Sequence, residues 1–172
     1  MHMKPQLKKF LSSKNIFILV ILGYFALMRG PGILKNFQHE GMQLTPEPYL
    51  VIYPKDLHST LFPPEKGAAL AIFWATWCGP CKVEMNRLKA SIENGKIPHG
   101  SVFAINPFET PAQVENFLKL SPYPFIFIEN GELSETLQIN VTPTSAFIED
   151  GKIISINSGM SIWGIWRAEM QL

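Results

Sequence analysis

Residues 73–82 read FWATWCGPCK, and the pattern of the chain changes on either side of them. Before them, residues 68–74 form an unbroken apolar run bounded by Gly67, which predicts a strand buried on both faces. After them, apolar side chains recur along one helical stripe, at Cys81, Met85, Leu88 and Ile92. The segment is therefore predicted to join the end of a central strand to the start of an amphipathic helix.

The rest of the chain continues this alternation. Thr110 is predicted to cap a helix, with Pro111 in its first turn and Gln113 closing a capping box. Asp150 and Gly151 predict a hairpin turn. The further strands are expected at 101–106, 124–129, 144–149 and 153–157, and the further helices at 110–120, 132–138 and from about 162. This order predicts an α/β fold in which helices flank a central mixed sheet. It leaves a flavodoxin-like sheet as an alternative to a thioredoxin-like one.

The N-terminal segment differs in charge from the body of the protein. Through Lys35 the chain carries six basic residues and no acid, so the remainder has a net charge of about −5. Residues 16–28 contain no charged side chain and follow four lysines, which is the pattern of a membrane-targeting signal. In a bacterial inner membrane, the lysines would keep the N-terminus in the cytoplasm and export the rest.

Two outcomes of this signal stay open, a cleaved signal peptide and a retained anchor. Thirteen helical residues span about 20 Å of a hydrocarbon core roughly 30 Å thick, which suits a signal peptide. Extension back to Phe10, with Lys14 snorkelling, makes an anchor feasible. A buried helix of a soluble protein would leave the flanking lysines unexplained. We expect a basic cytoplasmic arm at 1–15, a transmembrane signal-anchor with its flank at 16–35, a linker at 36–56 and a folded domain at 57–172. Within the linker, residues 49–53 are expected to add a short edge strand.

Composition excludes several classes of function. The net charge of +1 offers no bulk positive field for a nucleic acid. Two cysteines three positions apart cannot form a structural disulfide framework. The histidines are scattered singly, which argues against a structural zinc site; they are His2, His39, His58 and His99.

The two cysteines are placed for disulfide exchange. Cys78 is expected at a helix N-terminus, where unpaired backbone N–H groups favour the thiolate, which is the nucleophile. Cys81 lies one turn further along the buried stripe, from which it can resolve a mixed disulfide. Gly79 and Pro80 fit the turn between them, since Pro80 lacks an N–H where the helix needs none. We therefore expect Cys78 to attack and Cys81 to resolve.

A resemblance supports this interpretation. The segment 73–82 resembles the active-site signature of the thioredoxin superfamily, and together with the N-terminal signal it is similar to membrane-anchored thiol reductases of the TlpA and ResA type. A second match, Val141–Thr144, follows Cys81 by about sixty residues and is similar to the cis-proline segment of that family. The resemblance runs from about Ala68 to the C-terminus and implies a thioredoxin-like fold.

The resemblance also implies partners and site residues. Pro143 would be a cis proline facing the cysteines, and Thr142 would offer main-chain contacts to a substrate segment. Trp77 would cover Cys78. No bound cofactor and no metal are implied. The partners would be proteins with reactive cysteines and a membrane electron-transfer protein that restores the dithiol. The soluble domain would lie on the periplasmic side of the cytoplasmic membrane, held by a single-pass anchor.

Three positions depart from the family pattern. Many thioredoxins have a buried acid at the position of Ile72. A recurrent family glutamate matches Glu84, but the helical position of Glu84 is off the Cys81 stripe and predicts a solvated face. Asn86 stands where the family commonly has proline. The missing acid removes one expected source of proton transfer to the second cysteine.

Two other functions fit the same motifs. An oxidase would use the same cysteine pair to insert disulfides, and a binding or assembly module of thioredoxin fold would not need the cysteines at all. Reduction is the direction that the resemblance implies. A peroxidase fits less well, because no arginine near the motif suggests a peroxide pocket.

Overall fold

The structure is a computed structural model, and it describes residues 18, 20, 21, 23, 24, 39–160 and 162–172. The chain divides into two units, Met1–Gln38 and His39–Leu172. In the first unit the five described residues are helical. The predicted basic arm and most of the predicted anchor lie outside the described residues. Where the structure describes the chain, it contains no helix that combines the length and the apolar character needed to cross a bilayer.

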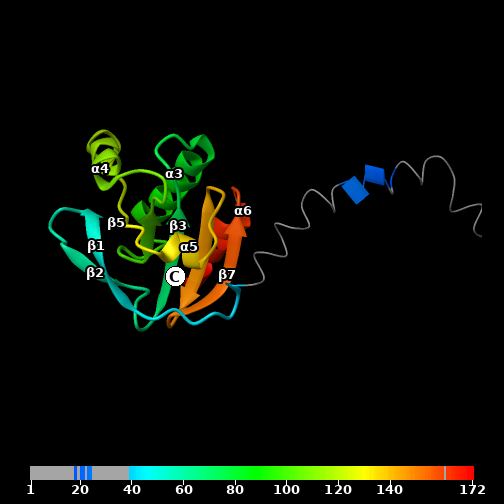
Figure 1. Cartoon of the computed structure of the whole chain (residues 1–172), viewed down its shortest axis with the longest axis horizontal. Coiled ribbons are helices and arrows are strands. Elements are labelled where there is room, and N and C mark those ends of the chain that lie inside the picture. The colour runs from blue at the N-terminus through cyan, green and yellow to red at the C-terminus, as the bar shows by residue number, and fades with distance from the viewer. Residues whose placement is uncertain (1–17, 19, 22, 25–38, 161) are drawn as a thin grey trace, which may run out of the picture. The chain divides into compact units, whose positions relative to one another are not determined.

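The second unit is built on a seven-stranded sheet (Figure 1). Its strands are β1 Glu47–Tyr53, β2 Ser59–Phe62, β3 Ala68–Phe73, β4 Val102–Ile105, β5 Ile126–Ile128, β6 Thr144–Glu149 and β7 Lys152–Ser158. They lie in the order β2-β1-β5-β4-β3-β6-β7. The central strands β3, β4 and β5 are parallel, while β1, β6 and their outer neighbours pair antiparallel. The predicted mixed sheet is confirmed.

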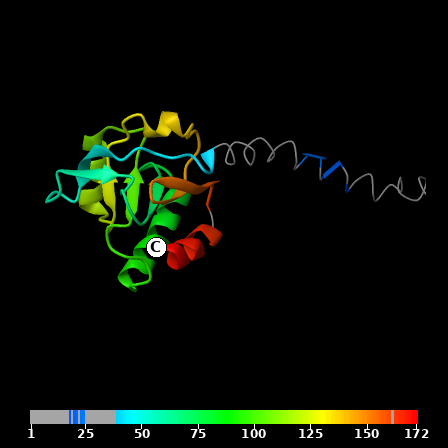
Figure 2. The same cartoon turned by 90° about the horizontal axis from the view of Figure 1, so that it is seen from below.

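Helices cover both faces of this sheet. The helices are α3 Gly79–Glu93, α4 Pro111–Leu120, α5 Leu133–Thr136 and α6 Ile162–Gln171. Figure 2 shows α3 and α6 side by side on one face and α5 on the other. Val114 and Leu118 of α4 belong to the same apolar cluster as the buried stripe of α3, so α4 covers the same face.

The apolar run of β3 serves two cores at once. Leu70 and Ile72 point into the cluster beneath α3, whereas Ala69, Ala71 and Phe73 point into the cluster on the α5 side. All five side chains are at most 2% exposed. A strand buried on both faces cannot alternate apolar with polar residues, which is why the sequence shows a continuous run.

The predicted helix signals are confirmed. The four stripe residues of α3 are each at most 1% exposed. At the start of α4 the backbone N–H of Gln113 donates to the Thr110 hydroxyl, and the backbone N–H of Thr110 donates to the Gln113 side chain at 2.9 Å. This reciprocal pair satisfies two backbone donors that a helix N-terminus leaves without an intrahelical partner.

The predicted hairpin between β6 and β7 is also confirmed. Asp150 and Gly151 have φ angles of 49° and 75°, as a turn of the type I′ class requires. A Cβ at Gly151 would lie 2.6 Å from the Gln43 side-chain nitrogen and 3.2 Å from the Leu44 carbonyl oxygen. Glycine is thus needed here for its φ angle and for the close approach of the 43–44 segment.

The region before Gly67 differs from the expectation. The sequence predicted a linker at 36–56 with an edge strand, but β1 lies inside the sheet between β5 and β2. The edge strand is β2, which the sequence did not reveal because it is short and mixed in polarity. Phe62 holds it in place, since this ring is 1% exposed and packs 4.8 Å from the ring of Phe103. The prolines around β1 predicted an irregular segment. The hydrogen bonds that β1 forms with β2 and β5 outweigh this local preference.

Candidate active site

Three connecting segments meet at one edge of the sheet. Strands β3 and β4 are parallel and in register, with Phe73 opposite Ile105. Strand β6 runs the other way and begins with Thr144 opposite Phe73. The end of β3, the end of β4 and the start of β6 therefore lie together. This edge carries residues 74–78, residues 106–110 and residues 141–143.

The cysteine pair lies where β3 passes into α3. Cys78 is the N-cap of α3, and Cys78 and Cys81 form a disulfide with their Cα atoms 5.3 Å apart. The backbone N–H of Cys81 donates to the Cys78 sulfur at 3.2 Å. Cys78 is 5% exposed and Cys81 is fully buried. A helix N–H directed at Cys78 would stabilise a thiolate there, and the difference in exposure favours Cys78 as the sulfur that an outside disulfide meets first.

The residues next to the pair lie on the surface. Gly79 and Pro80 are exposed and form the first turn of α3. Trp77 is 66% exposed, and its ring lies 5.8 Å from the ring of Phe108, itself 47% exposed. The indole therefore forms an exposed aromatic pair with a residue of the neighbouring segment.

The predicted proline segment lies at the same sheet edge. The Thr142–Pro143 peptide bond is cis, and Pro143 is buried. The Pro143 carbonyl accepts the N–H of Gly159 at 2.7 Å, which ties the segment to the end of β7. Thr142 forms no backbone-to-backbone hydrogen bond with any residue that the structure describes. Its main-chain groups are therefore available to pair with another polypeptide segment.

Glu84 is buried rather than solvated, which corrects the prediction. Its side chain is 2% exposed, and the Ser145 hydroxyl donates to its Oε1 at 2.8 Å. The helical position did point away from the Cys81 stripe, but β6 lies against that side of α3 and covers it. The sequence could not show this, because the covering strand comes sixty-one residues later.

A second polar group, which the sequence analysis did not single out, contacts the segment that leads into Cys78. The Glu109 carboxylate accepts the backbone N–H of Thr76 at 2.7 Å, the hydroxyl of Thr76, and the side-chain N–H of Asn106 at 2.7 Å. Partial burial raises the pKa of Glu109, but the hydrogen bonds from Thr76 and Asn106 and the charge of Lys82 outweigh it and hold that pKa below its ordinary value. Glu109 is therefore ionised at neutral pH.

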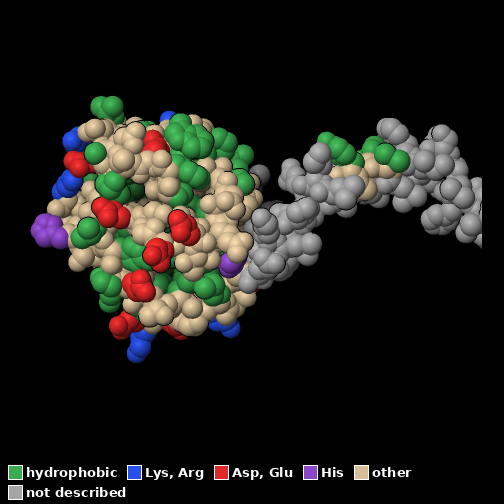
Figure 3. Space-filling view, in the orientation of Figure 1, with side chains coloured by type: hydrophobic (Ala, Val, Ile, Leu, Met, Phe, Trp, Pro, Cys, Tyr) green, Lys and Arg blue, Asp and Glu red, His purple; other side chains and the backbone are tan. Residues whose placement is uncertain are grey.

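A separate cavity lies on the opposite side of the sheet. It has a volume of about 550 Å³ and is lined by Glu47, Glu129, Glu132 and Tyr49 among others. Acidic side chains gather on this face over β1, β5 and α5 (Figure 3). Burial, followed by the charges of Glu47 and Glu132, raises the pKa of Tyr49. The cavity shares no lining residue with the cysteine turn, so it is not part of the candidate active site.

Within residues 39–160 and 162–172, and the few described before them, no group of three or more His, Cys, Asp or Glu side chains is placed to hold a metal ion.

The chain is similar in sequence to proteins named thioredoxin-like protein and thiol-disulfide oxidoreductase. The chain is 31% identical to a thioredoxin-like protein of Haemophilus influenzae over 99 residues, which are 56% of this chain and 58% of that protein. It is 34% identical to the thiol-disulfide oxidoreductase ResA of Bacillus thuringiensis over 85 residues, which are 48% and 49% of the two chains. The chain thus spans about half the length of the curated relatives it matches. No protein-family model matches the sequence.

A solved structure shows the same fold. StoA from Bacillus subtilis superposes with a TM-score of 0.59 at 21% identity, over 74% of this chain and 97% of that one. The chain therefore has a thioredoxin-like α/β fold. With the sequence relatives, this confirms the predicted resemblance to the thioredoxin superfamily and to its ResA-like proteins.

Proposed function

We propose that this thioredoxin-fold protein, similar in sequence to ResA-type proteins, is a thiol-disulfide oxidoreductase that cycles between a Cys78–Cys81 dithiol and disulfide. One observation carries the proposal. The two sulfurs form a disulfide at the start of α3, and the N–H of Cys81 is directed at the Cys78 sulfur. A structural disulfide would not need a sulfur at a helix N-terminus, whereas a nucleophilic thiolate is stabilised there.

The reaction follows from the unequal exposure of the two sulfurs. In the reducing direction, the Cys78 thiolate attacks one sulfur of a client disulfide, so that a Cys78–client bond forms and the client S–S bond breaks. The first client thiolate leaves and takes a proton from water. Cys81 then loses its proton and attacks the Cys78 sulfur, which releases the second client thiol and closes the Cys78–Cys81 disulfide. Two electrons pass to the client.

The client polypeptide would lie along the segment before β6. Thr142 has main-chain groups without a backbone partner in the described structure, and Pro143 fixes the course of the chain beside it. An extended segment that carries the reacting cysteine can add to this segment by main-chain hydrogen bonds. Trp77, which directly precedes Cys78, and its ring partner Phe108 both expose apolar surface.

Direction, partners and location belong to the same proposal. We propose reduction of cysteines in exported proteins, with a membrane electron-transfer protein restoring the dithiol and no bound cofactor taking part. The charge pattern of residues 1–35 supports a single-pass anchor in a bacterial cytoplasmic membrane, with the thioredoxin-like domain on the periplasmic side. The oxidase alternative uses the same steps in reverse.

A redox titration of the full-length chain in detergent tests direction. The fraction of Cys78–Cys81 disulfide is measured by alkylation and mass shift in dithiothreitol or glutathione buffers. A midpoint near the roughly −270 mV of thioredoxin supports a reductase, while one near the roughly −120 mV of a strong periplasmic oxidant supports the oxidase. Cysteines that never interconvert as a pair would remove the enzyme proposal.

A trapping experiment tests the mechanism. With Cys81→Ser, the resolving sulfur is lost, so a disulfide-containing peptide should accumulate as a mixed disulfide on Cys78. With Cys78→Ser, no adduct should form because Cys81 is buried. A binding module would keep its function in both variants, and equal trapping on either cysteine would contradict the assigned roles.

A further inference from the structure

The segment that carries Cys78 is fastened to its neighbour by one carboxylate. Glu109 follows β4 and accepts two hydrogen bonds from Thr76, one from the backbone N–H at 2.7 Å and one from the hydroxyl. Thr76 lies two residues before Cys78, in the segment that follows β3. The backbone N–H of Cys78 in turn donates to the Ala75 carbonyl at 3.1 Å. The contact between Glu109 and Thr76 therefore also restrains the backbone of Cys78, which is hydrogen-bonded to the adjacent residue Ala75.

Glu109 is itself held in place by Asn106. The Asn106 side-chain oxygen accepts the backbone N–H groups of Phe108 and Glu109 at 3.0 and 3.1 Å, and its side-chain nitrogen donates to the Glu109 carboxylate at 2.7 Å. Asn106 is 6% exposed and directly follows β4. These hydrogen bonds fix the turn at residues 106–109, directly after β4, and they hold the Glu109 carboxylate where it contacts Thr76.

The charge of Glu109 strengthens this contact. A carboxylate accepts shorter and stronger hydrogen bonds than a neutral oxygen, and the lowered pKa keeps this one ionised at neutral pH. The opposite charge of Lys82, in the first turn of α3, also lowers the pKa of Glu109. Three donors converge on one carboxylate, which is more than a surface glutamate needs for solubility.

We propose that Glu109 is a positioning residue for Cys78, which holds the sulfur at the N-terminus of α3 when the disulfide is open. This inference rests on the proposed function, because a redox cycle requires the open form. In the closed form the bond to Cys81 fixes the Cys78 sulfur. After reduction that bond is gone, and the place of the thiolate near the helix N–H groups then depends on the backbone of residues 75–78.

The test compares two glutamates in the reduced full-length chain. Glu109→Ala removes the contact with Thr76, and Glu115→Ala is the matched control. Glu115 also has a pKa lowered by hydrogen bonds, from Lys55 and then Lys119, but its ion pairs are with these two lysines and not with the cysteine segment. The measurement is the rate of Cys78 alkylation by iodoacetamide as a function of pH, with the modified site identified by mass spectrometry.

Glu109→Ala should raise the pKa of Cys78 toward the roughly 8.5 of a free thiol, and alkylation at pH 7 should slow several-fold. Glu115→Ala should follow the wild-type profile. Glu109→Gln should recover part of the loss, since its amide oxygen can still accept the Thr76 N–H. A purely structural role would lower the stability of the fold without moving this pH profile.

Three results would overturn the inference. The first is a Glu109→Ala profile equal to that of the wild type. The second is a lowered pKa, which would show that Glu109 acts by charge repulsion rather than by position. The third is a wild-type Cys78 with the ordinary pKa of about 8.5. If Glu109→Ala does not fold, Thr76→Val tests the inference, because it removes only the hydroxyl donor to Glu109. A smaller rise in the pKa of Cys78 then supports the inference, and an unchanged pKa overturns it. A wild-type pair that fails to cycle in the redox titration removes the proposed function instead.

Discussion

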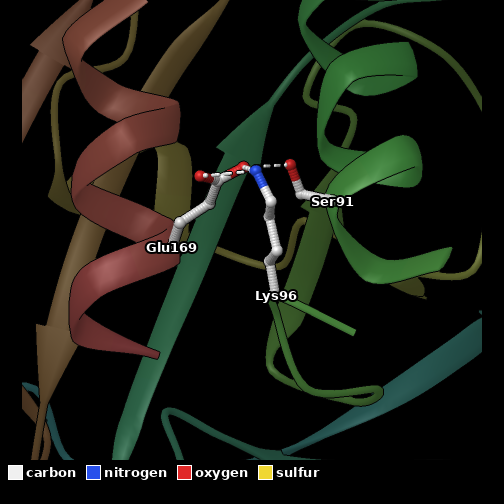
Figure 4. A network of polar contacts seen from close by, with 3 residues as sticks. All are labelled: Ser91, Lys96 and Glu169. Atoms are coloured by element: carbon white, nitrogen blue, oxygen red, sulfur yellow. Dashed lines mark hydrogen bonds and ion pairs between the residues drawn. The ribbon is translucent and has the colours of Figure 1, made fainter. Parts of the chain in front are cut away.

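The two ends of α3 are held by different kinds of contact. At the N-terminal end the N–H of Cys81 donates to the Cys78 sulfur, and that sulfur also forms the disulfide. At the C-terminal end the Ser91 hydroxyl donates to the Glu169 carboxylate of α6 at 2.7 Å, and the Lys96 ammonium lies 3.3 Å from the same carboxylate. Figure 4 shows these three side chains directed toward one another between the two helices.

If the proposed function is right, the difference explains how one helix can carry a reactive sulfur and still be stably held. A sulfur that must break and form bonds cannot also be the permanent anchor of its helix end. The permanent contacts are therefore placed elsewhere, in the Ser91, Lys96 and Glu169 cluster and in the Ser145 to Glu84 hydrogen bond midway along α3. Substitutions at the contacts that hold α3 should separate the two roles.

The largest effect is expected at the N-terminal end. Cys78→Ser should reduce the exchange rate with a peptide disulfide to that of the uncatalysed reaction. Its unfolding in reducing buffer should remain close to that of the reduced wild type, because serine is a favoured N-cap whose oxygen can accept the Cys81 N–H. Stopped-flow exchange and urea unfolding measure the two properties. A large loss of stability in Cys78→Ser would show that the sulfur anchors the helix after all.

A smaller effect, on stability alone, is expected midway along the helix. Ser145→Ala removes a hydroxyl that donates to the side chain of Glu84, which is 2% exposed, and a buried acceptor that loses such a partner costs about 1–3 kcal/mol. The control is Ser101→Ala, which removes a local hydrogen bond to Pro98 on the surface. Urea unfolding of both variants gives the comparison, and equal losses would contradict the structural importance of the buried pair.

The C-terminal end should contribute stability that depends on pH. The hydrogen bond from Ser91 lowers the pKa of Glu169 and exceeds the opposing effect of burial, and Lys96 adds to the lowering. A lowered pKa in the folded state means that the contribution is complete above the ordinary value of 4.5 and is lost as the pH falls through the folded value. Glu169→Gln should therefore have a lower free energy of unfolding than the wild type at pH 7, and this difference should disappear as the pH falls below 4.5.

Unfolding of Glu169→Gln across this pH range has a direct control. Glu93→Gln removes a carboxylate from an exposed pair with Lys89, at 3.9 Å, on the same helix. This control should show no comparable gap at pH 7. A gap for Glu169→Gln that persists unchanged at low pH would mean that the carboxylate charge does not stabilise this end.

The smallest effect on stability is expected at Trp77. Its indole is 66% exposed, so Trp77→Ala should change the free energy of unfolding by no more than about 0.5 kcal/mol. Loss of the exposed ring beside Cys78 should slow exchange with a peptide disulfide more than exchange with oxidised glutathione. Trp166→Ala, on α6 with 57% exposure, should leave both rates unchanged. Equal slowing of both substrates by Trp77→Ala would argue against a contact with the peptide.

Sequence periodicity predicted the elements well where the signal was local. The stripe on α3, the capping box at Thr110 and the turn at Asp150–Gly151 are all confirmed. Each depends on residues within a few positions of one another, so backbone geometry and side-chain chemistry are enough to predict it. The position of β1 inside the sheet and the presence of β2 were missed, because strand pairing joins segments distant in the sequence.

The candidate site divides in the same way. The cysteine pair, its place at a helix start and the second motif at Thr142–Pro143 could be predicted from the sequence, because each is a contiguous pattern. The burial of Glu84 against Ser145, and the contact of Glu109 with Thr76 thirty-three residues away, became visible only in the folded chain. Neither carboxylate lies near its partner along the chain. Their environments depend on which strands become neighbours, and that depends on the packing of the whole sheet rather than on any local pattern.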